Sequence, residues 1–271
     1  MAAPARDTLA ILARASSGGL LSVAVAADAL HVSSREAAVR LARLERGGWL
    51  ARAQRGLYVV RPLEAGPSTP STVEDPWVLA REIFSPCYIA GWTAAEHWGL
   101  TEQIFRETMV ATGAPRRKSR ERLLSTEFRI VRVGSERFRG LTEVWRGSER
   151  LPVSDRERTL VDALVDPSWV GGVRHLAEIL VSYRDSPHFD ITKMLTRLDE
   201  VGSGAAYKRI GFLAEALWPK ANAILDAANA RRTKGMIRLD PSVKSRGRMS
   251  KRWGLWINVT VTSAHDGPDD S

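Results

Sequence analysis

The feature that most constrains the fold is a short helix, at about residues 33–46, whose two ends are both marked in the sequence. Ser33 followed by Glu36 makes the Ser-x-x-Glu pattern of a capping box, which begins a helix, and Gly47-Gly48 ends it. Helical spacing gathers its apolar residues on one face: Ala37, Leu41 and Leu44. A helix this short is stable only when that face packs on neighbouring elements.

Two shorter helices are predicted before this helix and a β-hairpin after it. Residues 7–15 and 23–30 carry apolar side chains at helical spacing. Trp49-Leu50, a basic turn at 52–56 and the apolar run 57–60 predict a hairpin with a polar tip. Three short helices followed by a hairpin predict a winged helix-turn-helix domain over residues 1–61.

The solvent side of the third predicted helix is basic, with Arg35, Val39, Arg43 and Arg46 on it and Arg40 on its flank. Arginine can bind guanine through two hydrogen bonds or hold a phosphate, so the pattern predicts a recognition helix in a major groove. The residues predicted to contact bases in the groove are Ser34, Arg35 and Arg43. Those predicted to contact DNA phosphates are Arg40, Arg46, Arg52 and Arg55. Gln54 lies beside Arg52 and Arg55 at the hairpin tip and is predicted to contact DNA with them. A solvated arginine face on a protein-interaction module is the alternative interpretation.

Positive charge is concentrated in two blocks. Residues 1–61 hold nine arginines and four acids, residues 220–253 hold ten basic residues and two acids, and the stretch between them is nearly neutral. Two separate blocks indicate contact with a polyanion such as nucleic acid. A second polyanion contact is therefore predicted at the C-terminal block, the alternative being a solvated loop: Arg231, Arg232, Lys234, Arg238, Lys244, Arg246, Arg248, Lys251 and Arg252.

The remaining sequence predicts an α+β protein, in which the N-terminal winged helix-turn-helix is joined to a larger mixed α/β domain. Residues 62–76 contain four of the thirteen prolines and predict a linker. The second domain is expected at 77–262, with a disordered tail at 263–271. Strands are predicted at 108–112, 128–133, 141–145 and 253–262, and helices at 77–84, 88–98 (with Thr93 as a cap), 156–165 (with Ser154 as a cap), 173–183, 191–201, 205–217 and 222–230.

Four segments in a fixed order resemble the AbiEi-type antitoxins, also described as transcriptional regulators of viral defence systems. They are ARAQRGLYVV, YIAGWTAAEHWGLTEQ at 88–103, TMVATGAPRRKSR, and SDRERTLVDALVDPSWVGGVRHLAEIL at 154–180. The Arg-Thr-Leu-x-Asp core of the last segment, followed by Asp-Pro and Gly-Gly, is the most specific piece. The resemblance spans roughly residues 8–230.

The resemblance implies an antitoxin encoded beside a nucleotidyltransferase-like toxin. Such antitoxins repress their shared promoter through the N-terminal domain and oppose the toxin through the C-terminal domain. Many are of type IV, in which neutralisation need not involve binding to the toxin. We therefore expect an autorepressor of a toxin–antitoxin, phage-defence operon. It would bind double-stranded DNA of its own promoter, at an inverted or direct repeat occupied by two modules, as a dimer on DNA.

The chief alternative is an enzyme that the winged helix directs to nucleic acid, with residues 77–260 as its catalytic half. A restriction-type nuclease needs an Asp and a Glu-x-Lys to hold Mg²⁺, and no Glu in this chain precedes a Lys at that spacing. The Gly-x-x-x-x-Gly-Lys phosphate loop is also missing, and the five histidines lack metal-ligand spacing. We therefore expect no enzymatic activity, no cofactor and no metal.

An acidic cluster, a histidine and a cysteine in the second domain could also carry chemistry. Asp155, Glu157 and Asp162 form an acidic cluster, which suggests metal or phosphate chemistry or else a capped helix with a buried structural acid at Asp162. His97 is expected to be a packed, hydrogen-bonded core residue. Cys87, the single cysteine, is expected to be a small core residue rather than a nucleophile.

The expected location is the cytoplasm. The sequence has no apolar run of about 18 residues, which a membrane-spanning helix needs, and its N-terminus lacks the clean apolar stretch of a signal peptide. One cysteine cannot form an internal disulfide, which fits a reducing compartment.

Overall fold

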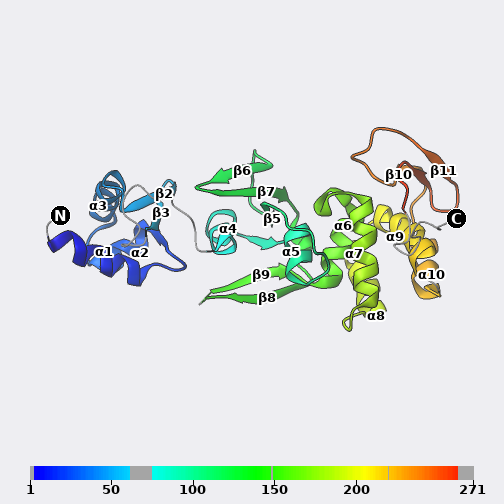
Figure 1. The fold of residues 1–271 in the computed structure, drawn as a ribbon, viewed down its shortest axis with the longest axis horizontal. Helices are drawn as coiled ribbons and strands as arrows, with labels where there is room; N and C mark the ends of the chain where they lie inside the picture. The colour runs from blue at the N-terminus through cyan, green and yellow to red at the C-terminus, as the bar shows by residue number, and fades with distance from the viewer. Residues whose placement is uncertain (1–2, 62–74, 148, 219, 262–271) are drawn as a thin grey trace, which may run out of the picture. The chain divides into compact units, whose positions relative to one another are not determined.

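The structure, a computed structural model, describes residues 3–61, 75–147, 149–218 and 220–261 (Figure 1). Within these ranges the protein is mixed α and β, with ten α-helices and three sheets. The predicted α+β class is therefore confirmed at this level. The chain divides into two compact units, called here the first and the second unit. The first comprises Met1–Cys87, Arg106–Arg132 and Glu143–Leu151, and the second comprises Tyr88–Phe105, Val133–Thr142 and Pro152–Ser271.

The first unit begins with three helices and a three-stranded antiparallel sheet. These elements are α1 (Ala3–Ala15), β1 (Leu20–Ser22), α2 (Val23–Leu30), α3 (Ser34–Arg46), β2 (Leu50–Gln54) and β3 (Leu57–Val60), with sheet order β1-β3-β2. The three predicted helices and the hairpin are present. Strand β1 was not predicted, because three residues are too few to show an alternating pattern. Leucines of α1, α3 and β2 meet in one core: Leu9, Leu12, Leu41 and Leu50.

Side-chain and left-handed caps define the ends of α2 and α3. The Ser22 hydroxyl accepts a hydrogen bond from the Val25 N–H at 3.2 Å and begins α2, which ends at His31 with a positive φ of 52°. The Ser33 hydroxyl accepts from the Glu36 N–H at 3.2 Å and begins α3 as predicted. The Glu36 carboxylate, however, is paired with Arg40. Only residues 31–33 separate the two helices.

The largest sheet has six strands in the order β6-β7-β5-β4-β9-β8. Its strands are β4 (Cys87–Ile89), β5 (Glu107–Thr112), β6 (Arg120–Leu123), β7 (Thr126–Arg132), β8 (Leu141–Arg146) and β9 (Glu149–Ser154), and helix α4 (Pro76–Phe84) precedes them. β5 pairs with β7 in parallel from Glu107↔Glu127 to Thr112↔Arg132, and β6 pairs with β7 in antiparallel fashion. The strands predicted at 108–112, 128–133 and 141–145 are confirmed, whereas β4, β6 and β9 were missed.

The helix predicted over residues 88–98 is wrong in its first part. Tyr88 and Ile89 lie in β4, and helix α5 (Gly91–His97) begins only after Ala90. Thr93 is therefore buried inside the helix and does not cap it. The three buried residues of β4 have no periodicity that distinguishes a strand from a helix. Only their pairing with β9 shows that they form a strand.

The second unit is built mainly from helices. They are α6 (Arg156–Val165), α7 (Val173–Asp185), α8 (Ile191–Val201), α9 (Gly204–Leu217) and α10 (Asn222–Arg231), with short 3-10 turns at Ser135–Arg137 and Pro167–Val170. All five helices were predicted to within about two residues. Helix α6 is buried from Glu157 to Leu164, because it packs against α5, α7, α8 and α9 (Figure 1). It therefore forms the centre of this core.

A small sheet closes the described part of the chain. It consists of β10 (Ile237–Arg238), β11 (Arg248–Ser250) and β12 (Leu255–Ile257), in the order β10-β12-β11. The strand predicted at 253–262 is thus confirmed only for three residues, because Trp253 and Gly254 form the turn before it. The tail predicted at 263–271 and most of the predicted linker lie outside the described residues. The division into domains at 1–61 and 77–262 stays a prediction.

Candidate nucleic-acid interface

The face of α3 that turns away from the core is rich in exposed arginine. Ala37 and Leu41 are fully buried, which fixes the orientation of the helix. The opposite side carries Val39, which is 55% exposed. All five predicted contact residues of this helix are exposed: Ser34, Arg35, Arg40, Arg43 and Arg46. The predicted division of α3 into an apolar and a basic face is therefore confirmed.

The arginines of α3 differ in how far their charge is already engaged. The Arg40 guanidinium lies 2.6 Å from the Glu36 carboxylate, one helical turn away. Arg46 donates from Nε to the carbonyl of Ala42 at 3.3 Å and keeps its terminal nitrogens free for other partners. Within the described ranges, Arg35 and Arg43 make no ion pair, and their guanidinium groups are available to a ligand.

The tip of the β2–β3 hairpin presents a second set of polar side chains. Arg52, Gln54 and Arg55 are all exposed. The register shifts between Arg52 and Gln54, and Gly56 turns the chain with a φ of +82°, a conformation that favours glycine. The Nε of Arg52 donates to the Gln54 carbonyl at 3.4 Å, a long hydrogen bond that leaves most of its donors unused. The hairpin therefore ends in exposed hydrogen-bond donors.

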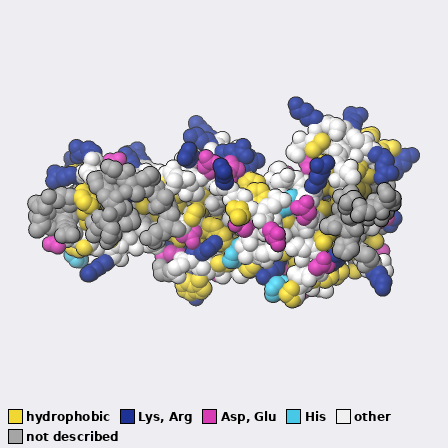
Figure 2. All heavy atoms as spheres, viewed as in Figure 1, with side chains coloured by type: hydrophobic (Ala, Val, Ile, Leu, Met, Phe, Trp, Pro, Cys, Tyr) yellow, Lys and Arg dark blue, Asp and Glu magenta, His cyan; other side chains and the backbone are white. Residues whose placement is uncertain are grey.

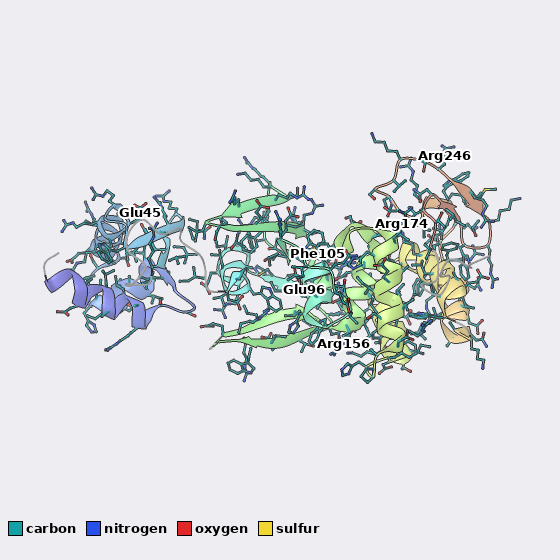
Figure 3. All side chains as sticks on the ribbon, viewed as in Figure 1. Glu45, Glu96, Phe105, Arg156, Arg174 and Arg246 are labelled. Carbon is teal, nitrogen blue, oxygen red and sulfur yellow. The ribbon has the colours of Figure 1, made fainter. Side chains whose placement is uncertain are left out.

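The C-terminal basic residues predicted as a second contact are exposed, and the small sheet organises the segment that carries them. Figure 2 shows Lys and Arg side chains gathered over this part of the chain, and Figure 3 labels Arg246 on the loop before β11. In the described part of the second unit, two of these residues are ion-paired, Arg231 with Asp199 at 2.7 Å and Arg252 with Glu215. The others are exposed and make no ion pair with any residue that the structure describes.

The acidic cluster on α6 is committed to internal ion pairs, which supports the structural interpretation. Asp162 has no exposed surface, and its carboxylate accepts from Arg158 at 2.9 Å, from Arg137 at 2.5 Å and from the Tyr88 hydroxyl at 3.3 Å. Burial raises the pKa of Asp162, and the two guanidinium groups oppose this shift. Burial also raises the pKa of the Tyr88 hydroxyl above its ordinary range.

The other two acids of this cluster hold α8 against α6. The Asp155 side chain accepts from the Arg158 N–H at 2.7 Å and also binds Arg197 of α8 at 2.8 Å. The Glu157 carboxylate binds Lys193 at 2.6 Å and accepts from the Tyr183 hydroxyl at 2.7 Å. Asp155 is therefore the cap of α6, and the predicted cap at the preceding residue is wrong. The Ser154 hydroxyl instead bonds to that of Thr159 at 2.7 Å.

The two remaining residues with reactive side chains have different surroundings. Cys87 is 6% exposed, and burial raises the pKa of its thiol to about 11. The prediction that it is a small core residue is confirmed. His97 packs against the ring of Trp98, as expected of a packed residue, but it is only half-buried and does not lie in the core. Across the described ranges, His, Cys, Asp and Glu form no group of three that could hold a metal ion.

Comparisons with known proteins bear on the fold alone. No family model matches the chain, and a search of the curated proteins also finds no match. Among solved structures, the crystal structure of the RV2827C protein from Mycobacterium tuberculosis is similar, with a TM-score of 0.62 and 19% sequence identity. The match covers 93% of this chain and 90% of that one. At this identity the likeness indicates a shared mixed α/β architecture.

Within the described ranges, every helix is too short or too polar to cross a bilayer.

Proposed function

We propose that the protein is a DNA-binding transcriptional repressor that acts through a winged helix-turn-helix formed by residues 1–61. The observation that carries this proposal is the pairing of an arginine-rich exposed face on α3 with exposed donors at the tip of the β2–β3 hairpin. In such domains the second helix of the helix-turn-helix enters the major groove, and the hairpin lies over the adjacent backbone or minor groove. In this chain α3 is the helix that follows α2 after a short turn, and the β2–β3 hairpin comes directly after α3.

Each contact residue can be given a role within this proposal. Arg35 and Arg43 are unpaired and one face of the helix presents both, so they read base edges together with Ser34. Arg46, Arg52 and Arg55 hold phosphates, which fix the position of the helix but carry no sequence information. Arg40 contributes less, because the Glu36 carboxylate already offsets its charge. The operator is a repeat, since two copies of a small reading domain give the required affinity.

The proposal is tested by fluorescence anisotropy of the full chain on its own upstream DNA and on a scrambled duplex, at about 150 mM salt. Specific binding should be at least about 100-fold tighter than binding to the scramble. The Arg35→Ala/Arg43→Ala variant should lose this preference. A matched control is Arg106→Ala/Arg174→Ala, which removes the same charge from two exposed positions outside α3. Equal, weak binding to both duplexes by the unmodified chain would refute the repressor proposal.

We further propose that the repressor is the antitoxin of a toxin–antitoxin operon and opposes a nucleotidyltransferase-like toxin. The sequence segments that resemble the AbiEi-type antitoxins support this proposal, and most of them lie outside the proposed DNA-binding domain. Repression and neutralisation should therefore be separable functions. Co-expression with the neighbouring toxin gene tests this, because the Arg35→Ala/Arg43→Ala variant should lose repression and still protect the cell. Absence of a nucleotidyltransferase gene beside this one would count against the antitoxin role.

A further inference from the structure

The small C-terminal sheet presents an aromatic side chain between basic residues on its outer face. Pairing aligns Trp256 of β12 with Arg238 of β10 on one side and with Met249 of β11 on the other. Paired residues of a sheet point to the same face, so these three side chains form one row across the strands. Arg238 is exposed, Met249 is 44% exposed and Trp256 is half-buried.

The alternation along β12 shows which face this row occupies. Leu255 is fully buried in the core of the second unit, and Ile257 packs against the same core. Trp256 stands between them and must point to the opposite side. Over its ring lies the guanidinium of Arg246, 5.6 Å from the ring centroid, on the exposed loop before β11 (Figure 3). The outer face is thus an indole ring bordered by two arginines.

Close backbone contacts hold this face in place. At Gly247, which has a φ of +68°, a Cβ atom would overlap the Ile257 carbonyl oxygen, so only glycine lets the loop approach β12 between Arg246 and Arg248. The Asn258 side chain donates to the carbonyls of Asp240 and Val243 at 2.8 and 3.0 Å. These contacts fix both ends of the loop 240–247 on the strand that carries Trp256.

The charge around the ring is almost entirely positive. Residues 231–252 contain nine basic side chains and a single acid, Asp240. Asp240 is 4% exposed, and its carboxylate accepts from the Val173 N–H at 2.9 Å, so it caps α7 and does not face a ligand. A ligand that reaches Trp256 therefore meets exposed cations without any exposed carboxylate from this segment.

We propose that this face of the second unit binds single-stranded nucleic acid, with a base stacked at Trp256 and with phosphates held by the surrounding Lys and Arg residues. An aromatic ring with nearby cations is the arrangement that binds unpaired bases, because every base offers a flat π face and every nucleotide a phosphate. Arginine planes also stack on bases, so Arg246 can either give way to a base or extend the stack. The bases of a duplex are already stacked and cannot reach the ring.

This inference does not depend on the proposed repressor function, since the two surfaces belong to different units of the chain. The test uses the full chain carrying Arg35→Ala/Arg43→Ala, so that α3 contributes little, and a fluorescein-labelled oligo(dT) or oligo(U) of about 20 nucleotides as the probe. The Trp256→Ala substitution should weaken binding by about tenfold, and Trp256→Phe should retain most of it, because phenylalanine also offers a ring face.

A matched control is Trp145→Ala on β8. Trp145 is 59% exposed and also has an arginine over its ring, Arg150 at 4.4 Å, but it lies outside the C-terminal segment. Its loss should leave the affinity for the oligonucleotide unchanged. The proposal is overturned if Trp256→Ala binds as tightly as its parent, if Trp145→Ala weakens binding equally, or if a blunt duplex of the same length binds this face better than the single strand does.

Discussion

At the scale of single residues, the second unit buries a charged pair on one helix. Arg158 and Asp162 lie one turn apart on α6 with almost no exposed surface, and Arg137 completes the cluster. Removing one member of a buried ion pair leaves an uncompensated charge, which is far more costly than losing a pair at the surface. The same residues that suggest catalysis in the sequence therefore act in the structure as part of the core.

The Asp162→Ala substitution should lower the free energy of unfolding by about 3–5 kcal/mol, because it leaves the buried guanidinium of Arg158 without its carboxylate and removes the partner of the half-buried Arg137. Urea denaturation followed by circular dichroism measures this change. Asp226→Ala is the control, since Asp226 is exposed and its removal should cost almost nothing. A variant at Asp162 that keeps full stability and loses only its function would instead assign this acid to a functional site.

Cys87 should resist alkylation in the folded protein. Its thiol is buried and burial raises its pKa to about 11, while the thiolate is the reactive form. The rate with iodoacetamide should stay low at neutral pH and rise only as the pH approaches 11 or when urea unfolds the protein. Mass spectrometry of modified protein over time measures the rate. Rapid modification of the native protein at neutral pH would contradict the buried placement.

At the scale of elements, residues far apart in the sequence complete each other's secondary structure. The residue before helix α7 is Gly172, which has no side chain to cap it, and Asp240, 67 residues beyond Val173, supplies the missing acceptor to the Val173 N–H. The indole of Trp253 lies directly on Gly211 of α9, and its Nε1 donates to Glu215 at 2.5 Å. The small sheet is thereby attached to the helical core.

Gly211→Ala should destabilise the second unit by about 1–3 kcal/mol, because the added Cβ would overlap the ring of Trp253. Replacing the indole as well, in Gly211→Ala/Trp253→Leu, removes that clash. The double variant should therefore lose less stability than the two single variants together. Urea denaturation of the four proteins tests this, and additive losses would show that the two residues do not touch.

At the scale of the whole molecule, basic charge is divided between the two units. The first unit carries it on α3, on the hairpin and on residues 106–132, which hold eight basic residues and three acids, and the second carries it on the small C-terminal sheet and its loop. Each phosphate contact releases counterions, so the number of contacts appears as the slope of affinity against salt concentration. The arginines should contribute unequally to this slope, because some of them are already ion-paired within the protein.

The salt dependence of duplex binding should separate Arg55 from Arg40. Arg55→Ala should reduce the slope of log Kd against log salt by the amount that corresponds to about one phosphate contact. The slope is measured between about 50 and 200 mM salt. Arg40→Ala should reduce it by less, because Glu36 already neutralises part of its charge. The Glu36→Gln/Arg40→Ala variant serves as the control for that ion pair. An equal reduction by both single variants would show that the ion pair opens on DNA.

Local signals in the sequence are sufficient to predict many of the helices of this molecule and its basic segments. The cap at Ser33, the two glycines after Arg46 and the helical spacing of Ala37 and Leu41 predict α3 and both of its faces, because they depend on residues within a few positions of one another. The helices α6 to α10 follow for the same reason. Both basic segments are likewise predicted from the sequence, because the order of charged residues along the chain is independent of how the chain folds.

Tertiary structure alone decides the features that join distant residues. The strands β4 and β10, with three and two residues, are too short to show a pattern, and they exist because partner strands supply their hydrogen bonds. No local signal links Asp240 to α7 or Trp253 to Gly211. The outward position of Trp256 depends on which neighbour of β12 is buried. Such contacts form only once the chain has folded. The sequence therefore determines most helices, several of the longer strands and the charge, while packing determines the shortest strands, the long-range caps and the surfaces they present.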